Sequence, residues 1–334
     1  MRALITGGAG FIGSHLAERL LDQGQQVTII DNLTTGQFEN IAHLEKRIGF
    51  HYAIEDIRNA TVMDRLVSEC DVIYHLAAAV GVFSIVSSPI DTIEINVGGT
   101  EVVLRTAKRY RKKVLIASTS EVYGKNEKVP FNEDDDRTLG PTNKSRWSYA
   151  ASKELDEFLA LAYHKSAELP VVIFRLFNTV GARQRGHYGM VFPRFVQWAL
   201  KNEPIQIYGD GGQQRCFGNV HDVVGAIIGL SESPQAVGEV FNIGTNEEIT
   251  ISELAERVKA STGSTSEIVK IPYDQAYEAG FEDMRRRIPD VSKIKRVIGW
   301  EPTTPLQETI DQIVKYHRGR LKLSKQDHPA SVRP

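Results

Sequence analysis

The sequence predicts an α/β protein with a Rossmann-type doubly wound parallel sheet and a smaller C-terminal α/β lobe. Short apolar runs alternate with helical stretches up to about residue 180, which is typical of a parallel sheet with helices on both faces. A glycine-rich turn joins the first apolar run to the first helical stretch. Beyond that region, prolines interrupt shorter elements, which indicates a change of architecture.

The first expected strand, residues 3–6, is followed by a stretch with helical spacing at residues 11–21. Glycines fill the turn between them, in an order that fits either of two dinucleotide-binding patterns: Gly7, Gly10 and Gly13, or Gly8, Gly10 and Gly13. Such a turn lets a pyrophosphate approach bare backbone at a helix N-terminus, here beside Phe11 and Ile12. The turn therefore predicts a dinucleotide cofactor.

The second apolar run, residues 26–30, ends at Asp31. An acidic residue at this strand end, with Asn32 beside it, is placed to bind the hydroxyls of the adenosine ribose. Because a carboxylate repels a 2′-phosphate, the predicted cofactor is NAD rather than NADP. Asp56 and Ile57 follow a third short strand and are candidates for the adenine site, although Asp also caps turns.

Later strands are expected at residues 72–77, 114–117 and 171–174. Ligands of doubly wound sheets bind beyond the carboxyl ends of the strands. Four residues at these ends are expected to face the nicotinamide half of the cofactor: Leu76, Ala77, Ala78 and Ser118. Asn96, in Asn-Val-Gly-Gly-Thr, is expected to support this region by side-chain hydrogen bonds, with a purely structural role inside a helix as the alternative.

Tyr149 and Lys153 lie four residues apart on an expected helix at residues 149–163, so their side chains share one face. A free phenol has a pKa of about 10. The Lys153 ammonium and a positively charged nicotinamide both favour the phenolate, so we expect the pKa of Tyr149 to fall toward that of a useful general base. Thr119, at a preceding strand end, is expected to share the substrate hydroxyl proton. The pair and the glycine-rich turn together predict a redox enzyme.

Composition excludes several other classes of protein. The chain of 334 residues is 41% hydrophobic and 25% charged, and a net charge of −2 without a long basic block argues against nucleic-acid and membrane partners. No apolar run reaches membrane-spanning length, and from the early first strand we expect no signal peptide. Cys70 and Cys216 have no metal-type spacing and nine histidines form no ligand cluster, so we expect no metal and a cytoplasmic protein.

These observations divide the chain into three parts. Residues 1–180 are expected to form the NAD-binding domain, with later segments such as 215–245 open to joining it. Residues 181–320 are expected to form mainly the substrate-binding lobe. The polar tail at 321–334 carries two prolines, and we expect it to be frayed.

The chain resembles the extended short-chain dehydrogenases/reductases, specifically the NAD-dependent nucleotide-sugar epimerases, dehydratases and decarboxylases. The resemblance covers nearly the whole chain, since seven motifs occur in family order: GGAGFIG, Asp31-Asn32, HLAA, NVGGT, STSEVYG, YAASK and RLFNTVG. It implies a UDP-sugar or related substrate and a homodimer through helices near 92–110 and 149–165, although apolar positions there equally suit packing on the sheet. Asn178 and Arg215 match positions that hold the diphosphate and nucleotide, with a structural ion pair as the alternative for Arg215.

The resemblance also implies a shared first step, in which the phenolate takes the C4 hydroxyl proton of the sugar while hydride passes to NAD. The 4-ketone acidifies C5 and makes a C5 carboxylate a β-keto acid. Three outcomes then remain open, namely 4-epimerisation, 4,6-dehydration and decarboxylation of a uronate.

Ser120 and Glu121 narrow these outcomes. Simple hexose epimerases mostly have a small or hydroxyl residue at the position of Glu121, whereas deoxythymidine-linked glucose dehydratases have Asp where Ser120 stands. Residues 277–290 and Arg146-Trp147 resemble UDP-glucuronate decarboxylases, and Arg287 aligns with their catalytic arginine. By this resemblance, Arg287 and Thr119 stabilise the uronate and the developing enolate, and Glu121 positions the water or proton for C5.

Other residues favour different outcomes. An arginine near position 287 also binds diphosphate in 4-epimerases. Arg183-Gln-Arg185 resembles uronate 4-epimerases, in which the counterpart of Arg185 binds the carboxylate, with a surface basic pair as the alternative. We therefore expect decarboxylation of UDP-glucuronate to a UDP-pentose or 4-keto-pentose, with a UDP-glucuronate or UDP-glucose 4-epimerase as the alternative. A 4,6-dehydratase and a non-catalytic NAD-binding sensor are the less favoured alternatives, and the intact Tyr149 and Lys153 argue against a sensor.

Overall fold

The computed structural model describes residues 1–81, 88–186, 190–272, 284 and 286–327. Seven strands form one sheet in the order β11-β6-β5-β4-β1-β2-β3, and each neighbouring pair is parallel. The strands are β1 (Arg2–Thr6), β2 (Gln26–Asp31), β3 (Phe50–Ile54), β4 (Val72–His75), β5 (Lys113–Thr119), β6 (Val171–Leu176) and β11 (Val240–Ile243). The predicted doubly wound α/β fold is confirmed.

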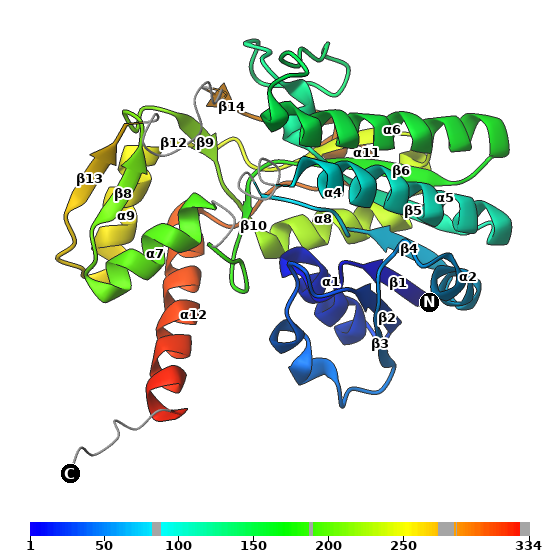
Figure 1. Cartoon of the computed structure of the whole chain (residues 1–334), viewed down its shortest axis with the longest axis horizontal. Coiled ribbons are helices and arrows are strands. Elements are labelled where there is room, and N and C mark those ends of the chain that lie inside the picture. The colour runs from blue at the N-terminus through cyan, green and yellow to red at the C-terminus, as the bar shows by residue number, and fades with distance from the viewer. Residues whose placement is uncertain (82–87, 187–189, 273–283, 285, 328–334) are drawn as a thin grey trace.

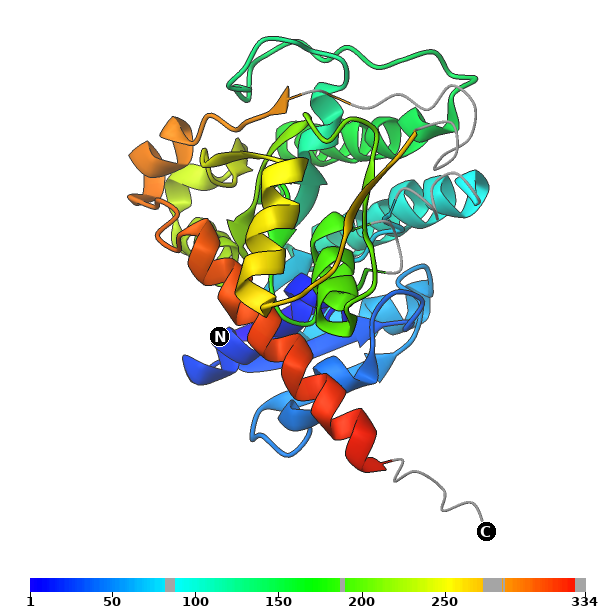
Figure 2. The same ribbon diagram turned by 90° about the vertical axis from the view of Figure 1, so that its left-hand side faces the viewer.

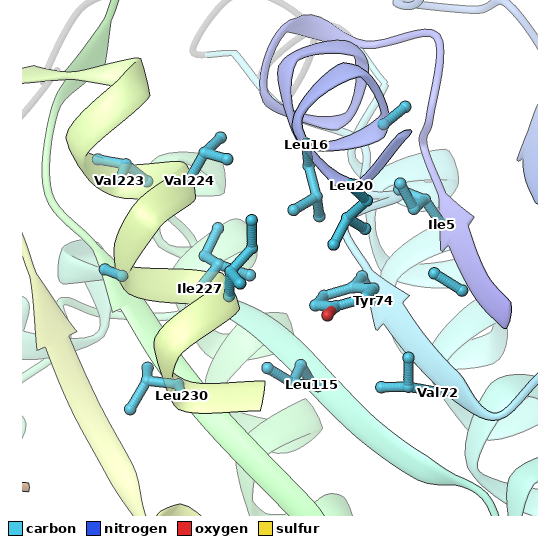
Figure 3. Close-up of a cluster of buried hydrophobic side chains, with 14 of the residues drawn as sticks. Ile5, Leu16, Leu20, Val72, Tyr74, Leu115, Val223, Val224, Ile227 and Leu230 are labelled. Atoms are coloured by element: carbon cyan, nitrogen blue, oxygen red, sulfur yellow. The ribbon is translucent and has the colours of Figure 1, made fainter. Parts of the chain in front are cut away.

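Helices cover both faces of this sheet (Figure 1). One face carries α1 (Phe11–Asp22) and α8 (Val220–Glu232), and the other carries α2 (Ala60–Glu69), α5 (Gly99–Tyr110) and α6 (Ser148–Ala167). Figure 3 shows the first of these layers, where Leu16 and Leu20 of α1 and Val223 and Ile227 of α8 meet over the strands. Tyr74 of β4 and Leu115 of β5 face them from the sheet. Because both faces of the central strands are buried, these strands read as near-continuous apolar runs rather than alternating ones, whereas the edge strand β3 has exposed positions.

Short elements lie between and around these helices and strands. They are the 3-10 helices η1 (Phe38–Asn40), η2 (Ala42–Leu44), η4 (Ser120–Tyr123), η5 (Ser145–Trp147) and η6 (Pro234–Ala236), the π-helix η3 (Glu94–Gly98), the helices α4 (Pro89–Ile93) and α11 (Ser292–Ile298), and the strands β7 (Thr179–Val180) and β10 (Gly218–Asn219). Within the described residues, no helix combines the length and the apolar character needed to cross a membrane.

The second lobe has its own small core beside the sheet (Figure 2). It comprises α7 (Val191–Lys201), β8 (Ile205–Tyr208), β9 (Gln214–Cys216), β12 (Glu248–Thr250), α9 (Ile251–Thr262), β13 (Ile268–Ile271), β14 (Arg286–Arg287) and α12 (Leu306–Asp327). Residues 220–243, which form α8 and β11, belong to the sheet layer. In the sequence they lie between the lobe elements α7–β9 and the lobe elements that begin at β12. The lobe thus lies beyond the carboxyl ends of the sheet strands, and the chain passes between the sheet and the lobe several times.

The expectation of a frayed tail from residue 321 is wrong for residues 321–327, because α12 continues through Asp327. Buried Ile310, Ile313 and Val314 fix the first half of α12 in the lobe core. Adding a residue to a helix that has already formed is much easier than starting one, so the helix extends beyond its buried part. Residues 328–334 of the predicted tail lie outside the described residues.

Candidate active site

A cavity of about 750 Å³ is lined by the carboxyl ends of the sheet strands and by the second lobe. This volume is in the range of cofactor and small-molecule sites. The residues singled out from the sequence for binding or chemistry line it, with the exceptions of Asn96 and of Gly8 from the second glycine pattern. The ends of β1, β2, β4, β5 and β6 contribute one wall, and α7, β8 and β9 contribute the other.

The glycine-rich turn forms the floor of the sheet side of the cavity. Gly7 has a φ of +71°, and a Cβ there would lie 2.8 Å from the backbone nitrogen of Ala77, which no L-residue tolerates. A Cβ at Gly13 would lie 2.2 Å from the carbonyl oxygen of Gly7. Gly10 precedes α1 without a side-chain cap, so the first N–H groups of that helix point toward the cavity without a capping oxygen. This geometry fits a pyrophosphate.

Asp31 lies at the end of β2, beside this turn. Its carboxylate accepts hydrogen bonds from the backbone N–H of Ala9 at 3.0 Å and of Leu33 at 2.8 Å. Burial raises the pKa of Asp31, and these backbone donors oppose that rise. A Cβ at Gly36 would lie 2.6 Å from Asp31 Oδ1, so the loop passes directly over the carboxylate. The site can receive the two hydroxyls of a ribose.

Asn32 and Asp56 meet at the same end of the cavity, where Asn32 Nδ2 donates to Asp56 Oδ2 at 3.1 Å. Arg58 binds both oxygens of Asp56 at 2.9 Å, and this hydrogen-bonded pairing lowers the pKa of Asp56 to about 2. Ile57 is buried and faces Gly99, at which a Cβ would lie 2.4 Å from Ile57 Cδ1. With Asp31, all four residues predicted for the adenosine end therefore line the same cavity.

Asn96 lies behind the cavity wall instead of on it. Its Oδ1 accepts from the backbone N–H of Ala79 at 2.8 Å, and its Nδ2 donates to Ser152 Oγ at 3.0 Å. The side chain therefore connects the loop after β4 to α6, next to the residues expected to face the nicotinamide.

Tyr149 and Thr119 meet in the centre of the cavity and share a hydrogen bond between their hydroxyl groups. We expected Lys153 to lower the pKa of Tyr149, but in the protein without its cofactor this pKa is raised. Burial and the negative charges of Glu121 and Asp156 raise that pKa, while the bond to Thr119 opposes the rise. Lys153 instead donates from Nζ to Asp156 Oδ2 at 2.7 Å, so much of its charge is neutralised on the side away from the cavity.

Glu121 is held between arginines. Arg146 Nη1 donates to Glu121 Oε2, and Arg287 Nη1 lies 3.7 Å from Glu121 Oε1 and 3.4 Å from Ser120 Oγ. Burial alone would raise the pKa of Glu121, but the charges of Arg146, Arg287 and Arg215 bring it below its ordinary value. The result is an ionised carboxylate next to guanidinium groups at the cavity wall.

Arg146 is the principal site residue to which the sequence assigned no role. The available signal was its position three residues before Tyr149, since an acid as buried as Glu121 needs a nearby cation. Two lobe residues in the wall, Arg194 and Tyr208, were also missed. The Arg194 guanidinium stacks 4.7 Å above the Tyr208 ring, and neither residue has a motif spacing that would mark it.

The second lobe brings the predicted substrate residues to the same cavity. β14 pairs with β9 so that Arg287 lies in register with Arg215. Asn178 donates to the backbone carbonyl of Cys216 at 3.1 Å, at the end of β6. Arg185 lines the cavity and is exposed.

Two other sequence predictions can be placed in the same way. Arg183, the partner of Arg185 in the expected basic pair, forms an ion pair with Glu18. Residues 277–283 and 285, part of the decarboxylase-like stretch, lie outside the described residues.

Among the described residues, no cluster of His, Cys, Asp and Glu could hold a metal ion.

Comparison with known proteins identifies the family of this chain. A family model described as GDP-mannose 4,6 dehydratase matches residues 4–313. A UDP-N-acetyl-alpha-D-glucosaminuronate decarboxylase of Bacillus cytotoxicus is 43% identical, over 95% of this chain and 98% of that protein. UDP-glucuronic acid decarboxylase 1 of Danio rerio is 37% identical, over 96% of this chain and 73% of that protein.

Among solved structures, a UDP-glucuronic acid 4-epimerase from Bacillus cereus, in complex with UDP-glucuronic acid and NAD, has a TM-score of 0.86 and 30% identity. The match covers 96% of this chain and 100% of that chain. The family resemblance read from the motifs is thereby confirmed. The chain belongs to the GDP-mannose 4,6-dehydratase family, within the extended short-chain dehydrogenases/reductases.

Proposed function

We propose that this protein is an NAD-dependent enzyme that oxidises C4 of a UDP-linked uronate and then decarboxylates it. The observation that carries this proposal is the ionised Glu121 between Arg146 and Arg287, in the same cavity as Tyr149 and Thr119. An enzyme that only oxidises and re-reduces C4 has no need for such a buried acid. The two decarboxylases that are 43% and 37% identical over 95% and 96% of this chain support the assignment.

The residues of the chain have distinct tasks in this proposal. The glycine-rich turn and Asp31 hold NAD, which when bound accepts the hydride from C4. Tyr149 takes the C4 hydroxyl proton and Thr119 steadies the oxygen that loses it. In the 4-ketone, the bond between C5 and the carboxylate breaks, carbon dioxide leaves, and the electron pair becomes an enolate with its charge on O4.

Arg287 and Ser120 are placed to contact the sugar at its carboxylate end. Arg287 lies 3.7 Å from Glu121, longer than the usual charge-assisted hydrogen bond, so a second carboxylate can compete for it. Arg146 keeps Glu121 in place meanwhile, and Glu121 orients the water or proton that reaches C5. Asn178, Arg215 and the lobe wall hold the UDP portion.

A 4-epimerase is the second candidate, because Arg185 also lines the cavity. An arginine bound to the uronate carboxylate would prevent the loss of carbon dioxide and leave only the change at C4. In that case the ketone turns over in the site and is reduced from its other face.

The direct test supplies NAD and UDP-glucuronate, or its 2-acetamido counterpart, and follows products by mass spectrometry and proton NMR. Loss of carbon dioxide supports the decarboxylase. An unchanged mass with inverted C4 would identify a 4-epimerase instead. Absence of turnover on both uronates rejects a uronate substrate, and UDP-glucose then becomes the next one to assay.

Asp31→Ser should weaken NAD binding by about 10-fold or more and reduce the preference for NAD over NADP, because one charged acceptor for the ribose is lost along with its repulsion of a 2′-phosphate. Fluorescence titration with both cofactors measures the two affinities. Asp22→Ser, an exposed change on α1, serves as the control. An unchanged ratio of the NAD and NADP affinities would show that Asp31 does not discriminate at the 2′ position of the adenosine ribose.

We also propose a homodimer that packs through α4 and α6 and works in the cytoplasm. Ile90 and Ile93 on α4 and Leu155 and Phe158 on α6 are exposed by 47 to 70%, and α4 contacts α6. Exposed apolar side chains gathered on neighbouring helices are typical of an interface. Cys70 and Cys216 are both free and buried, as suits a reducing compartment.

The double variant Ile90→Glu/Leu155→Glu should be a monomer, since two charges would be buried unpaired in the interface. Light scattering coupled to gel filtration measures the mass. Ile48→Glu, which changes a fully exposed apolar residue elsewhere, is the matched control and should keep the native mass. A dimeric double variant would rule out this pair of helices as the interface.

A further inference from the structure

A chain of buried polar side chains runs beneath the cavity from β1 to α6 and ends at Asp156. Asp156 is fully buried, and its Oδ2 accepts from Lys153 Nζ at 2.7 Å. Its Oδ1 has no hydrogen-bond partner among the described residues, and the hydroxyl of Thr100 on α5 interacts with the carboxylate and lowers its pKa. Thr100 Oγ1 lies 3.0 Å from His75 Nε2, and His75 Nδ1 lies 2.8 Å from Thr6 Oγ1. These five side chains connect two strands of the sheet, β1 and β4, to the two helices α5 and α6.

The chemistry of the groups fixes the direction of these hydrogen bonds. A carboxylate only accepts, so Thr100 directs its single hydroxyl proton toward Asp156. The proton between Thr100 and His75 must then come from His75 Nε2. Burial lowers the pKa of His75 to about 3, so the neutral ring has no second proton, and its Nδ1 accepts from Thr6. Every donor thus points along the chain toward Asp156.

We propose that Asp156 is a positioning residue which, with Thr100 and His75 behind it, orients the Lys153 ammonium and so limits how strongly that ammonium supports the Tyr149 phenolate. The inference rests on the proposed role of Tyr149 as the base. Tyr149 and Lys153 lie on the same helix as Asp156, and the negative charge of Asp156 itself favours protonated Tyr149.

The other titratable and charged groups around these residues are partnered among themselves. Glu157 on α6 binds Arg175 of β6 at 2.8 Å, and Glu121 of η4 binds Arg146 of η5. His75 of β4, which interacts electrostatically with Lys153, is neutral, as above. The charge of Lys153 is therefore divided chiefly between Asp156 behind it and the cavity in front.

This arrangement has a mechanistic consequence. An ammonium held by a carboxylate at 2.7 Å presents less net positive charge to the cavity than one without a counter-ion. Tyr149 then stays protonated in the resting protein, and the cation of bound NAD adds the charge that makes the phenolate accessible. Asp156 thereby couples the strength of the base to occupation of the cofactor site.

The test is a titration of the Tyr149 phenolate by ultraviolet difference absorbance, with Tyr149→Phe as the blank, in NAD-loaded and NAD-free protein. Asp156→Asn should lower the Tyr149 pKa by about half a unit to one unit in both forms, because a neutral amide no longer neutralises Lys153. The acidic limb of kcat/KM against pH should move by the same amount. A lower rate with an unmoved titration would mean that Asp156 is merely structural, and would overturn the proposal.

A second pair of variants keeps the test decisive if Asp156→Asn fails to fold. Thr100→Val removes one donor from Asp156, leaves more negative charge beside Lys153, and should raise the Tyr149 pKa. Thr100→Ser keeps the hydroxyl and should match the natural protein. Equal titrations in both Thr100 variants would also overturn the proposal. Because the phenolate titration needs no substrate, it remains valid if the uronate assignment fails.

Discussion

Replacing Tyr149 by phenylalanine should lower kcat by about 10²–10⁴-fold, the range for loss of a positioned acid–base group. The substitution removes one hydroxyl, which in this structure bonds to Thr119 in the centre of the cavity. It leaves the ring, the glycine-rich turn and Asp31 unchanged. The expected result is therefore a protein that binds NAD and UDP-sugar as before but no longer oxidises C4.

Two measurements separate chemistry from binding in this variant. Rapid mixing with substrate should show no early rise in reduced-cofactor absorbance, while calorimetric titration should give an unchanged NAD affinity. Tyr163→Phe, on the same helix α6, is the matched control and should retain full activity. Retained redox chemistry in Tyr149→Phe would reject Tyr149 as the base.

The sheet side of the site was largely predictable because local sequence determines it. Gly13 is required by a close contact with the backbone of Gly7 in the same turn, and Asp31 lies at the end of a short, mostly apolar strand. Each of these features is encoded within a few residues.

The pairings across the lobes were not predictable from the sequence. Arg146 and Arg287 are more than a hundred residues apart, yet both contact Glu121, because β14 joins β9 beside the cavity. Likewise, nothing near Lys153 in sequence shows whether its ammonium faces Tyr149 or Asp156. That choice depends on burial and on competing hydrogen bonds, which only the folded chain reveals.

The tail prediction failed for a related reason. Its composition is polar, and polar composition alone predicts exposure rather than loss of helix. The buried face of α12 lies earlier, at Ile310, Ile313 and Val314, and the helix simply continues from there.

Arg287→Gln should reduce carbon dioxide release by about 10²–10³-fold, the cost of removing one donor aimed at developing charge. The side chain is buried, lies 3.7 Å from Glu121, and is in register with Arg215 on the adjacent strand. Its loss also removes one of the charges that keep the pKa of Glu121 low, so that pKa should rise. Arg286→Gln is the matched control, since Arg286 is exposed on the same strand and pairs with Glu248.

The way in which Arg287→Gln fails distinguishes the two candidate reactions. If Arg287 acts at the uronate carboxylate, reduced cofactor should still form on mixing with substrate, because C4 oxidation precedes the step that needs the arginine. The fall should then lie in kcat, with the oxidised sugar accumulating on the enzyme. If Arg287 only binds the diphosphate, KM should rise with little change in kcat, because that contact is equally strong in the bound substrate and in the transition state. A pure KM effect would therefore count against decarboxylation and favour the 4-epimerase, in which Arg185 is the residue that binds the carboxylate.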